Sequence, residues 1–391
     1  MHIKKRVEEI FDELVQIRRD FHMYPELSGK EIRTSDKICE YLDEWNIEYE
    51  RGIADTGVVG IIRGKSQGKT VAVRADMDAL PILEDNGKDF KSKNIGVMHA
   101  CGHDVHTSIL LGTAKILKEM EEHIQGNIKL FFQPAEEAIG GAERMVKEGC
   151  MGNPHVDYVI GLHVMPYLEV GEVELKYGKL NAQSGSVTIK VHGKSGHAAY
   201  PNTAVDAIVI AGNVVSSLQT LVSRNISPLD SLVLSLGTIN GGTKNNIITD
   251  EVAITGTLRT LDSETRQYAK DRISSIVENT ARAYGGSGEA IFKDGYIALV
   301  NDNRVVDLIK ENAISVVGEE KIKMKEFPSL GGEDFSYFLQ NTEGAFFHLG
   351  CGNKEKGITE PLHNVNFDVD ENCMKTGVEL QVKNVLSLLK Y

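Results

Sequence analysis

The sequence has few cysteines, no excess of basic residues and no long uncharged apolar run, and each lack excludes a class of protein. Five cysteines in 391 residues are few, odd in number and widely spread, so a disulfide framework is improbable and a reducing compartment fits better. Asp and Glu outnumber Lys and Arg by 56 to 43, which gives a formal charge of -13. No basic run offsets this charge, so nucleic acid is not an expected partner.

No apolar run approaches the length that crosses a membrane. Residues 1–21 carry apolar side chains at helical spacing with charges between them, unlike the uninterrupted core of a signal peptide. Two Gly-Lys-Ser triplets lack the first glycine of a phosphate-binding loop. We therefore expect a cytoplasmic chain without a membrane partner.

The chain is longer than one hydrophobic core usually supports, which favours two domains. Its first half alternates amphipathic helices with short apolar strands. This order predicts an α/β fold with a mixed or parallel sheet and helices on both faces. The predicted helices cover 1–21, 31–46, 106–121 and 142–148, and the predicted strands cover 57–63, 70–74, 127–132 and 158–163.

A different pattern begins near residue 183, in the order β-α-β-β-α-β that is typical of a ferredoxin-like α+β module. Further helices are predicted over 304–317 and 374–389. The module is therefore predicted as an insertion, residues 183–296, in a larger domain of residues 1–182 and 297–391. Its predicted strands cover 186–191, 231–238, 251–260 and 289–292, and its helices 203–223 and 263–284.

The segment His-Ala-Cys-Gly-His-Asp places Cys101 between His99 and His103. Gly102 permits a tight turn into a helix, whose N-terminus favours a thiolate. Sulfur and imidazole ligands suit a borderline-soft divalent metal. His106, one turn further, could be a third local ligand, a residue behind the ligands or a packing residue. The other cysteines lack such neighbours and are interpreted as inert buried side chains.

Glu136 and Glu137 follow the predicted buried strand 127–132, at the strand end where open α/β sheets place ligands. One carboxylate can bind metal while the other exchanges protons with an attacking water. His163 ends another predicted strand, whereas His363 lies in a loop that the sequence does not position. Together these residues predict a metal-dependent hydrolase.

Several segments, in order along nearly the whole chain, resemble the M20 metallopeptidases. The resemblance is to the amidohydrolase branch, which includes hippurate hydrolases, indole-3-acetyl-amino-acid hydrolases, N-acyl-amino-acid amidohydrolases (aminoacylases) and N-acetyldiaminopimelate deacetylases. The matching segments are residues 19–28, 74–81, 99–104, 133–137, 161–163, 196–201, 331–335 and 361–364.

The resemblance implies a two-metal catalytic domain in which Cys101 bridges both ions, with Mn²⁺, Zn²⁺, Co²⁺ or Ni²⁺ as candidates. Glu136 is implied as the general base, and His106 is not a ligand in this branch. The remaining implied ligands are His103, Glu137, His163 and His363.

The chain departs from other M20 peptidases at two positions. They carry His-x-Asp where this chain has Asp76-Met-Asp78, so that histidine is absent and His103 takes its place. Their bridging carboxylate is here the thiol of Cys101. Asp78 is then expected to orient the centre from behind the ligands.

The resemblance also implies that the inserted domain is a lid and a dimerisation domain in a homodimer or homotetramer. His197 would supply a hydrogen bond to the tetrahedral oxyanion from the lid of the partner subunit. Asn246 and Arg259 would bind the carboxylate of the substrate, although either could be structural.

The expected function is hydrolysis of the amide bond of small N-acyl-L-amino acids such as acetyl or benzoyl derivatives. Alternatives are N-acetyldiaminopimelate deacetylation and dipeptidase or carboxypeptidase-type cleavage. A binding protein on the same fold is a further alternative, because a fold does not prove a function. The complete ligand set and the adjacent glutamates argue against it.

Overall fold

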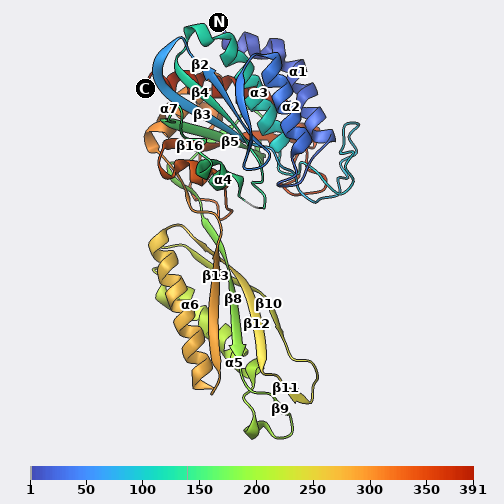
Figure 1. Ribbon diagram of the computed structural model, residues 1–391, viewed down its shortest axis with the longest axis vertical. Helices are drawn as coiled ribbons and strands as arrows, with labels where there is room; N and C mark the ends of the chain where they lie inside the picture. Colours follow the sequence, from blue (N-terminus) through green and yellow to red (C-terminus); the bar gives the residue numbers. More distant parts are fainter. Residues whose placement is uncertain (1, 139) are drawn as a thin grey trace. The chain divides into compact units, whose positions relative to one another are not determined.

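The computed structural model describes residues 2–138 and 140–391 and divides into two compact units, each visible in Figure 1. The large unit comprises Met1–Leu180, Val300–Phe327 and Asp334–Tyr391. The small unit comprises Asn181–Leu299 and Pro328–Glu333.

The large unit is built on one mixed sheet. The central strands β4, β3, β5 and β16 are parallel neighbours, whereas β1 and β2 are antiparallel at one side. This confirms the predicted α/β class. In sheet order the strands are β1 (Glu48–Ile53), β2 (Gly57–Arg63), β4 (Gln125–Gln133), β3 (Ser66–Asp76), β5 (Tyr158–Glu169), β16 (Glu343–Gly352), β6 (Val173–Leu175) and β15 (Ile322–Met324).

Helices cover both faces of this sheet (Figure 1). One face carries α4 (Gly141–Lys147) and the 3₁₀ turn η5 (Asp334–Gln340). Phe338 of η5 packs on Phe131 of the sheet, with ring centroids 5.3 Å apart. The opposite face carries α1 (Ile3–Met23), α2 (Ile32–Glu44), α3 (His103–Glu119), α7 (Asn303–Val317) and α8 (Cys373–Leu388).

The apolar stripe of α1 explains why this helix forms and where it packs. Buried side chains recur at helical spacing, so one face of α1 joins the core. Gly112 of α3 lets the helices approach closely, because a Cβ there would lie 2.9 Å from Leu14 and 3.0 Å from Val378. Three helices therefore meet at this glycine. The buried apolar residues of α1 are Val7, Ile10, Leu14, Ile17 and Phe21.

The small unit has the predicted ferredoxin-like topology. Its strands are antiparallel in the order β10-β12-β8-β13, and two helices pack on the sheet. Asp206 and Asp262 begin these helices by accepting hydrogen bonds from backbone amides of the first turn. In chain order the elements are β8 (Gln183–His192), β9 (Gly196–His197), α5 (Ala207–Thr220), β10 (Leu232–Gly241), β11 (Ile247–Ile248), β12 (Glu251–Thr260), α6 (Ser263–Ala283) and β13 (Ser287–Asp294).

The segment Ala207–Asn225 corrects one expectation from the sequence. It is 19 residues long and has a mean hydropathy of 1.2 over an 18-residue window, so it is the one helix among the described residues long and apolar enough to cross a membrane by length and composition. One side of it, with Ile210, Val214 and Leu218, is buried in the core of the small unit. The core helix of a soluble protein passes the same test, so the length and hydropathy of this segment are weak evidence that it spans a membrane.

Two element boundaries differ from the prediction in ways that concern the site. Helix α3 begins at His103 rather than at residue 106, so the His-Ala-Cys-Gly-His-Asp segment includes its first two residues, His103 and Asp104. Strand β5 continues to Glu169, which corrects the prediction that it ends at His163. It continues because β16, a strand that was not predicted, pairs with it beyond that point.

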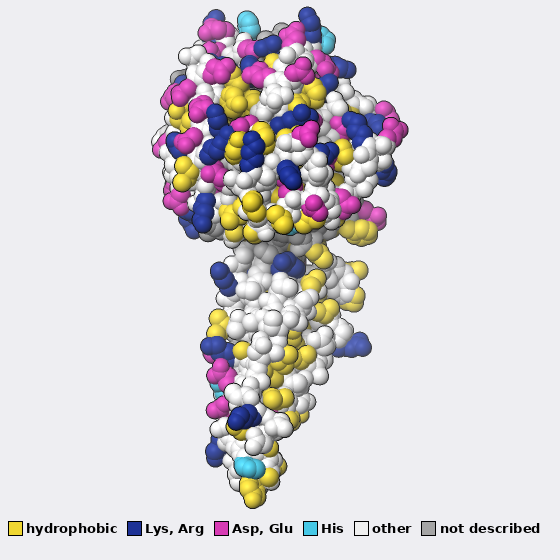
Figure 2. Space-filling view, turned by 90° about the vertical axis from the view of Figure 1, so that its right-hand side faces the viewer, with side chains coloured by type: hydrophobic (Ala, Val, Ile, Leu, Met, Phe, Trp, Pro, Cys, Tyr) yellow, Lys and Arg dark blue, Asp and Glu magenta, His cyan; other side chains and the backbone are white. Residues whose placement is uncertain are grey.

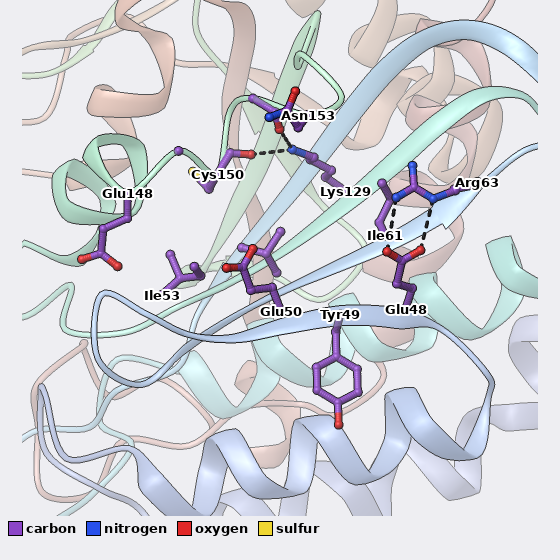
Figure 3. A pocket seen from close by; sticks show the side chains of 13 residues that line it. Glu48, Tyr49, Glu50, Ile53, Ile61, Arg63, Lys129, Glu148, Cys150 and Asn153 are labelled. Atoms are coloured by element: carbon purple, nitrogen blue, oxygen red, sulfur yellow. Dashed lines mark hydrogen bonds and ion pairs between the residues drawn. The ribbon is translucent and has the colours of Figure 1, made fainter.

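A pocket of about 320 Å³ lies beside β1, β2 and β4 (Figure 3). Its buried Lys129 donates hydrogen bonds to the carbonyls of Cys150, at 2.8 Å, and Gly152, and thereby ties the segment after α4 to β4. Burial lowers the pKa of Lys129 and raises that of the Cys150 thiol to about 12. None of the predicted metal ligands lines this pocket.

The remaining elements are short. They are η1 (Glu121–His123), β7 (Gly178–Asn181), η2 (Pro201–Thr203), η3 (Leu221–Asn225), β14 (Leu299–Asn301), η4 (Glu319–Lys321) and η6 (Lys354–Lys356).

Candidate metal centre

The turn before α3 brings Cys101 and His103 into the interior of the large unit. Gly102 has φ +83°, a conformation that side chains with a Cβ rarely adopt. A Cβ at this position would also lie 2.5 Å from Val164. The turn therefore favours glycine, and it leaves Cys101 7% exposed and His103 1% exposed.

His163 lies in the middle of β5 and faces the thiol. Its Nε2 is 3.3 Å from Sγ of Cys101, and its Nδ1 is 2.7 Å from the carbonyl oxygen of Val164. If Nδ1 carries the proton and donates it to that carbonyl, the Nε2 lone pair is available to a metal. Cys101, His103 and His163 offer ligand atoms within 4.8 Å of one another.

Asp78 links two of the predicted ligands. Its Oδ1 is 3.1 Å from Nδ1 of His103, and its Oδ2 accepts hydrogen bonds from the backbone amide of Glu137 at 3.0 Å and the hydroxyl of Ser28 at 2.6 Å. These contacts are those of a residue that orients ligands rather than binding the metal itself.

His103 presents an unsatisfied nitrogen to the centre. Its Nε2 is buried without a hydrogen-bond partner among the described residues, and carboxylate oxygens of Asp76 and Glu137 stand 3.6 and 3.9 Å away. A buried polar atom without a partner is rare in proteins. A metal ion would satisfy it, so the residues present fit a metal.

Glu136, Glu137 and His363 complete the cluster. Glu136 is buried, and one of its oxygens lies within 4.8 Å of ligand atoms of His103 and Glu137. The backbone amide of His363 donates to the carbonyl of Ala100 at 2.8 Å, which brings the imidazole Nε2 to 3.4 Å from Glu137 Oε1. The structure thus places in the cluster the residue that the sequence left unpositioned.

The electrostatics of the cluster favour a cation. Burial, together with Glu137 and Glu136, raises the pKa of Cys101 well above its usual range. Burial lowers the pKa of His103, but Asp76 and Asp78 outweigh burial and raise the pKa to about 10. A divalent cation would stabilise both the thiolate and the carboxylates.

Both ring nitrogens of His106 have hydrogen-bond partners, and these partners show whether it can be a metal ligand. Its Nδ1 is 2.6 Å from Asp76 Oδ1, and its Nε2 accepts a hydrogen bond from the backbone amide of Val164 at 2.9 Å. Although Asp76, His103 and His106 lie close enough to hold an ion, a nitrogen that accepts an N–H bond has no lone pair left for it. Of the alternatives from the sequence, the geometry favours a residue behind the ligands.

Two buried ionic networks around the cluster were missed from the sequence. Arg74 donates to Asp76 at 2.7 Å and to Asp334 at 3.0 Å. Arg18 donates to Asp104 at 2.8 Å, and His22 Nδ1 lies 2.8 Å from the same carboxylate. All of these residues except Arg18 stand in the segments that resemble the family, but nothing in their spacing signals a buried pair.

The small unit carries the three predicted substrate-contacting residues at its two ends. His197 is exposed, and the amide of the following residue donates to the carbonyl of Asn246 at 3.1 Å, so these two residues lie together at the β9–β11 end (Figure 1). Arg259 is paired with Ser184 at the opposite end of β8, roughly 25 Å away at about 3.3 Å per residue. Its Nη1 donates to Thr257 and to the carbonyl of Leu258.

A mixed α/β sheet with a buried cluster of thiol, imidazole and carboxylate groups defines a metallohydrolase. The chain belongs to peptidase family M20/M25/M40, whose model matches residues 72–387, and it is a hydrolase of that family.

Similar proteins cover almost the whole chain. It is 43% identical over 381 residues to thermostable carboxypeptidase 1 of Saccharolobus solfataricus, covering 96% of this chain and 95% of that protein. It is 40% identical over 365 residues to N-acetyl-L-cysteine deacetylase of Bacillus subtilis, covering 93% and 85%. The crystal structure of the Bacillus subtilis YXEP protein, a dinuclear metal binding peptidase, has a TM-score of 0.85 at 31% identity and covers 98% and 99%.

Proposed function

We propose that this chain is a two-metal amidohydrolase that cleaves the amide bond of N-acyl-L-amino acids to a carboxylate and a free amino acid. The observation that carries the proposal is the position of Glu136, a buried carboxylate beside His103 and Glu137 in a cluster suited to metal. Identity of 40% to an N-acetyl-L-cysteine deacetylase supports the N-acyl amino acid as substrate class.

The ligand atoms of the cluster limit which metals it would bind. One thiolate, three imidazoles and one carboxylate suit Zn²⁺, Co²⁺ or Ni²⁺, and the carboxylate keeps Mn²⁺ as a candidate. When bound, a pair of such ions polarises the scissile carbonyl and lowers the pKa of a water. The residues that would hold the pair are Cys101, His103, Glu137, His163 and His363.

The protein's own groups move the proton and orient the reactants. Glu136 takes a proton from the attacking water and delivers it to the nitrogen of the leaving amine. Asp78 contacts both the imidazole of His103 and the backbone amide of Glu137, so it fixes the positions of both residues relative to Glu136. His197 donates a hydrogen bond to the oxyanion from the small unit of a second subunit, which acts as a lid.

The small unit offers a surface for this second subunit. Helix α5 has no charged residue over 207–220, and Ile208 and Val209 on it are 55% and 48% exposed. Strand β10 is an edge strand of its sheet. Figure 2 shows hydrophobic side chains in yellow along the small unit, with charged side chains scattered between them. Pairing of two copies through this face, in a homodimer or in each pair of a homotetramer, would cover the helix and the edge.

The same arrangement would divide substrate recognition between subunits. His197 and Asn246 lie at one end of the small unit and Arg259 at the other, so one copy does not join all three around one ligand. We propose that Asn246 and Arg259, each from a different copy, bind the substrate carboxylate. Since the five cysteines are free and buried, a reducing cytoplasm suits the chain.

Peptide hydrolysis is the second candidate, and the 43% identity to a carboxypeptidase favours it. N-acetyldiaminopimelate deacetylation would need sites for a second ammonium and carboxylate.

The deciding experiment uses chelator-treated protein with Mn²⁺, Zn²⁺, Co²⁺ or Ni²⁺ restored. The substrates are N-acetyl-methionine, N-acetyl-cysteine, hippurate, N-acetyldiaminopimelate and a dipeptide. Metal-dependent release of amino acid from the N-acyl amino acids supports the proposal. Release from the dipeptide alone replaces it with peptidase activity, and no release with any metal contradicts both.

A further inference from the structure

Glu31 is a buried carboxylate outside the metal cluster, and it binds the turn that carries the proposed base. Its side chain lies just before α2 and is 0% exposed. Oε1 accepts hydrogen bonds from the backbone amides of Gly29 and Ala135, each at 2.9 Å, and Oε2 accepts one from the hydroxyl of Thr56 at 2.7 Å. None of these bonds goes to a candidate metal ligand.

The turn that Glu31 binds has an unfavourable backbone. Ala135 has φ +57°, in the left-handed region that residues with a Cβ rarely adopt, and Glu136 follows it directly. The carbonyl of Ala135 accepts bonds from the amides of Gly140 and Gly141 at 2.9 and 3.3 Å. Such a conformation persists only where surrounding contacts hold it, and such residues cluster at functional sites.

Two carboxylates hold alternate amides of this turn. Glu31 accepts from Ala135, and Asp78 accepts from Glu137, so the contacts flank Glu136 on both sides. The two differ in what else they bind. Asp78 also contacts His103, so its loss would disturb the ligands, whereas Glu31 otherwise binds Gly29 and Thr56.

We propose that Glu31 is a positioning residue for amide hydrolysis, which fixes the carboxylate of Glu136 toward the attacking water by holding the amide of Ala135. The inference rests on the proposed role of Glu136 as the base. Because Glu136 is not a predicted ligand, loss of the Glu31 contact should lower kcat while KM and metal content stay unchanged. A displacement of about 1 Å in a reacting group typically costs ~10²-fold in rate.

The test compares four variants. Glu31→Ala removes the acceptor, and Glu31→Asp keeps the charge but withdraws the carboxylate by one methylene, so it carries the test if the alanine variant does not fold. Glu31→Gln keeps an acceptor oxygen for both amides and places its own amide beside the hydroxyl of Thr56. Thr56→Val removes one neighbour of the carboxylate and leaves the bond to Ala135, so it is the matched control.

The expected result is a fall in kcat of ~10²-fold for Glu31→Ala and a smaller fall for Glu31→Asp, with KM and bound metal unchanged. Glu31→Gln and Thr56→Val should stay within about threefold of the wild type. Hydrogen exchange followed by mass spectrometry should show faster exchange in the peptide over residues 131–142 for the alanine and aspartate variants, and not for the other two.

The inference is overturned if the folded alanine or aspartate variant keeps the wild-type kcat, or if exchange over 131–142 does not change. It is also overturned if activity falls only in proportion to lost metal, or if Glu31→Gln is as slow as Glu31→Ala. Glu136→Gln is measured alongside. Wild-type turnover in that variant refutes the base itself, whereas the exchange data still report whether Glu31 holds the turn.

Discussion

The imidazole of His106 accepts a hydrogen bond from the backbone amide of Val164, the residue after His163. This bond ties the first turn of α3 to β5 at the point where β5 presents a predicted ligand. The other ring nitrogen is held by Asp76, so the orientation of His106 is fixed from both sides.

Replacement of His106 should therefore weaken metal binding although it is not a ligand. His106→Ala is expected to lower metal affinity ~10–100-fold, as loss of groups that orient ligands typically does. His106→Gln keeps an acceptor for the amide of Val164 and should lose less. Isothermal titration of metal into the stripped variants measures this, and affinities equal to the wild type in both would contradict the assignment.

Cys101 should be required for metal occupancy, because it is the predicted bridge between the ions. Cys101→Ala is expected to lose metal and activity together. Cys150→Ala is the matched control, since Cys150 is also a buried free cysteine but lines a pocket without predicted ligands. Elemental analysis of the purified variants gives the metal content. Full occupancy in Cys101→Ala would remove this residue from the centre.

The local features of the site could be predicted from the sequence, because they depend on adjacent residues. The turn at Gly102 and the glutamates after β4 are of this kind. His363 could not be positioned, since only its backbone bond to Ala100 brings it to the cluster. Glu31 gave no signal either, because its contact with Ala135 joins residues far apart in the chain.

Periodicity predicted most of the central strands, but glycines obscured one of them. Strand β16 contains Gly344, Gly350 and Gly352, which in a sequence usually mark loops. Here they permit close approach to β5, since a Cβ at Gly344 would lie 2.0 Å from the carbonyl oxygen of Val159. Pairing with β16 extends β5 beyond His163, where the sequence predicted its end.

Glu174 should make the stability of the large unit depend on pH. Burial raises the pKa of this carboxyl, but hydrogen bonds from His348, Tyr167 and Lys325 outweigh burial and lower it to about 2 from 4.5. A lowered pKa in the folded state stabilises the fold above the unfolded value, and the effect is lost as pH falls from 4.5 toward 2.

The measurement is Tm between pH 3 and pH 7. Glu174→Gln should melt below the wild type near neutral pH, and the difference should shrink as the pH falls below 4.5. A difference that is constant over this range would show that the ionised form of Glu174 contributes nothing.

The proposed subunit interface makes a prediction about α5. Val209→Lys would place a charge on the face proposed to pair and should shift the protein toward monomer in light scattering. Ile291→Lys is the control. Ile291 lies on β13, at the edge of the sheet opposite β10. Val209 and Ile291 are similarly exposed, at 48% and 47%. If His197 acts on a partner, the monomeric variant should also lose ~10²–10³-fold in kcat. An unchanged oligomer in Val209→Lys would refute this interface.

The role of Glu136 is the central claim, and one comparison tests it most directly. Wild type and Glu136→Gln are stripped of metal, reloaded with the same ion, and assayed for hydrolysis of N-acetyl-methionine with metal content measured on the same samples. The account predicts equal metal content and a turnover in the variant reduced by at least ~10²-fold, because general base catalysis contributes about that much. Substantial turnover in the fully loaded variant would contradict it.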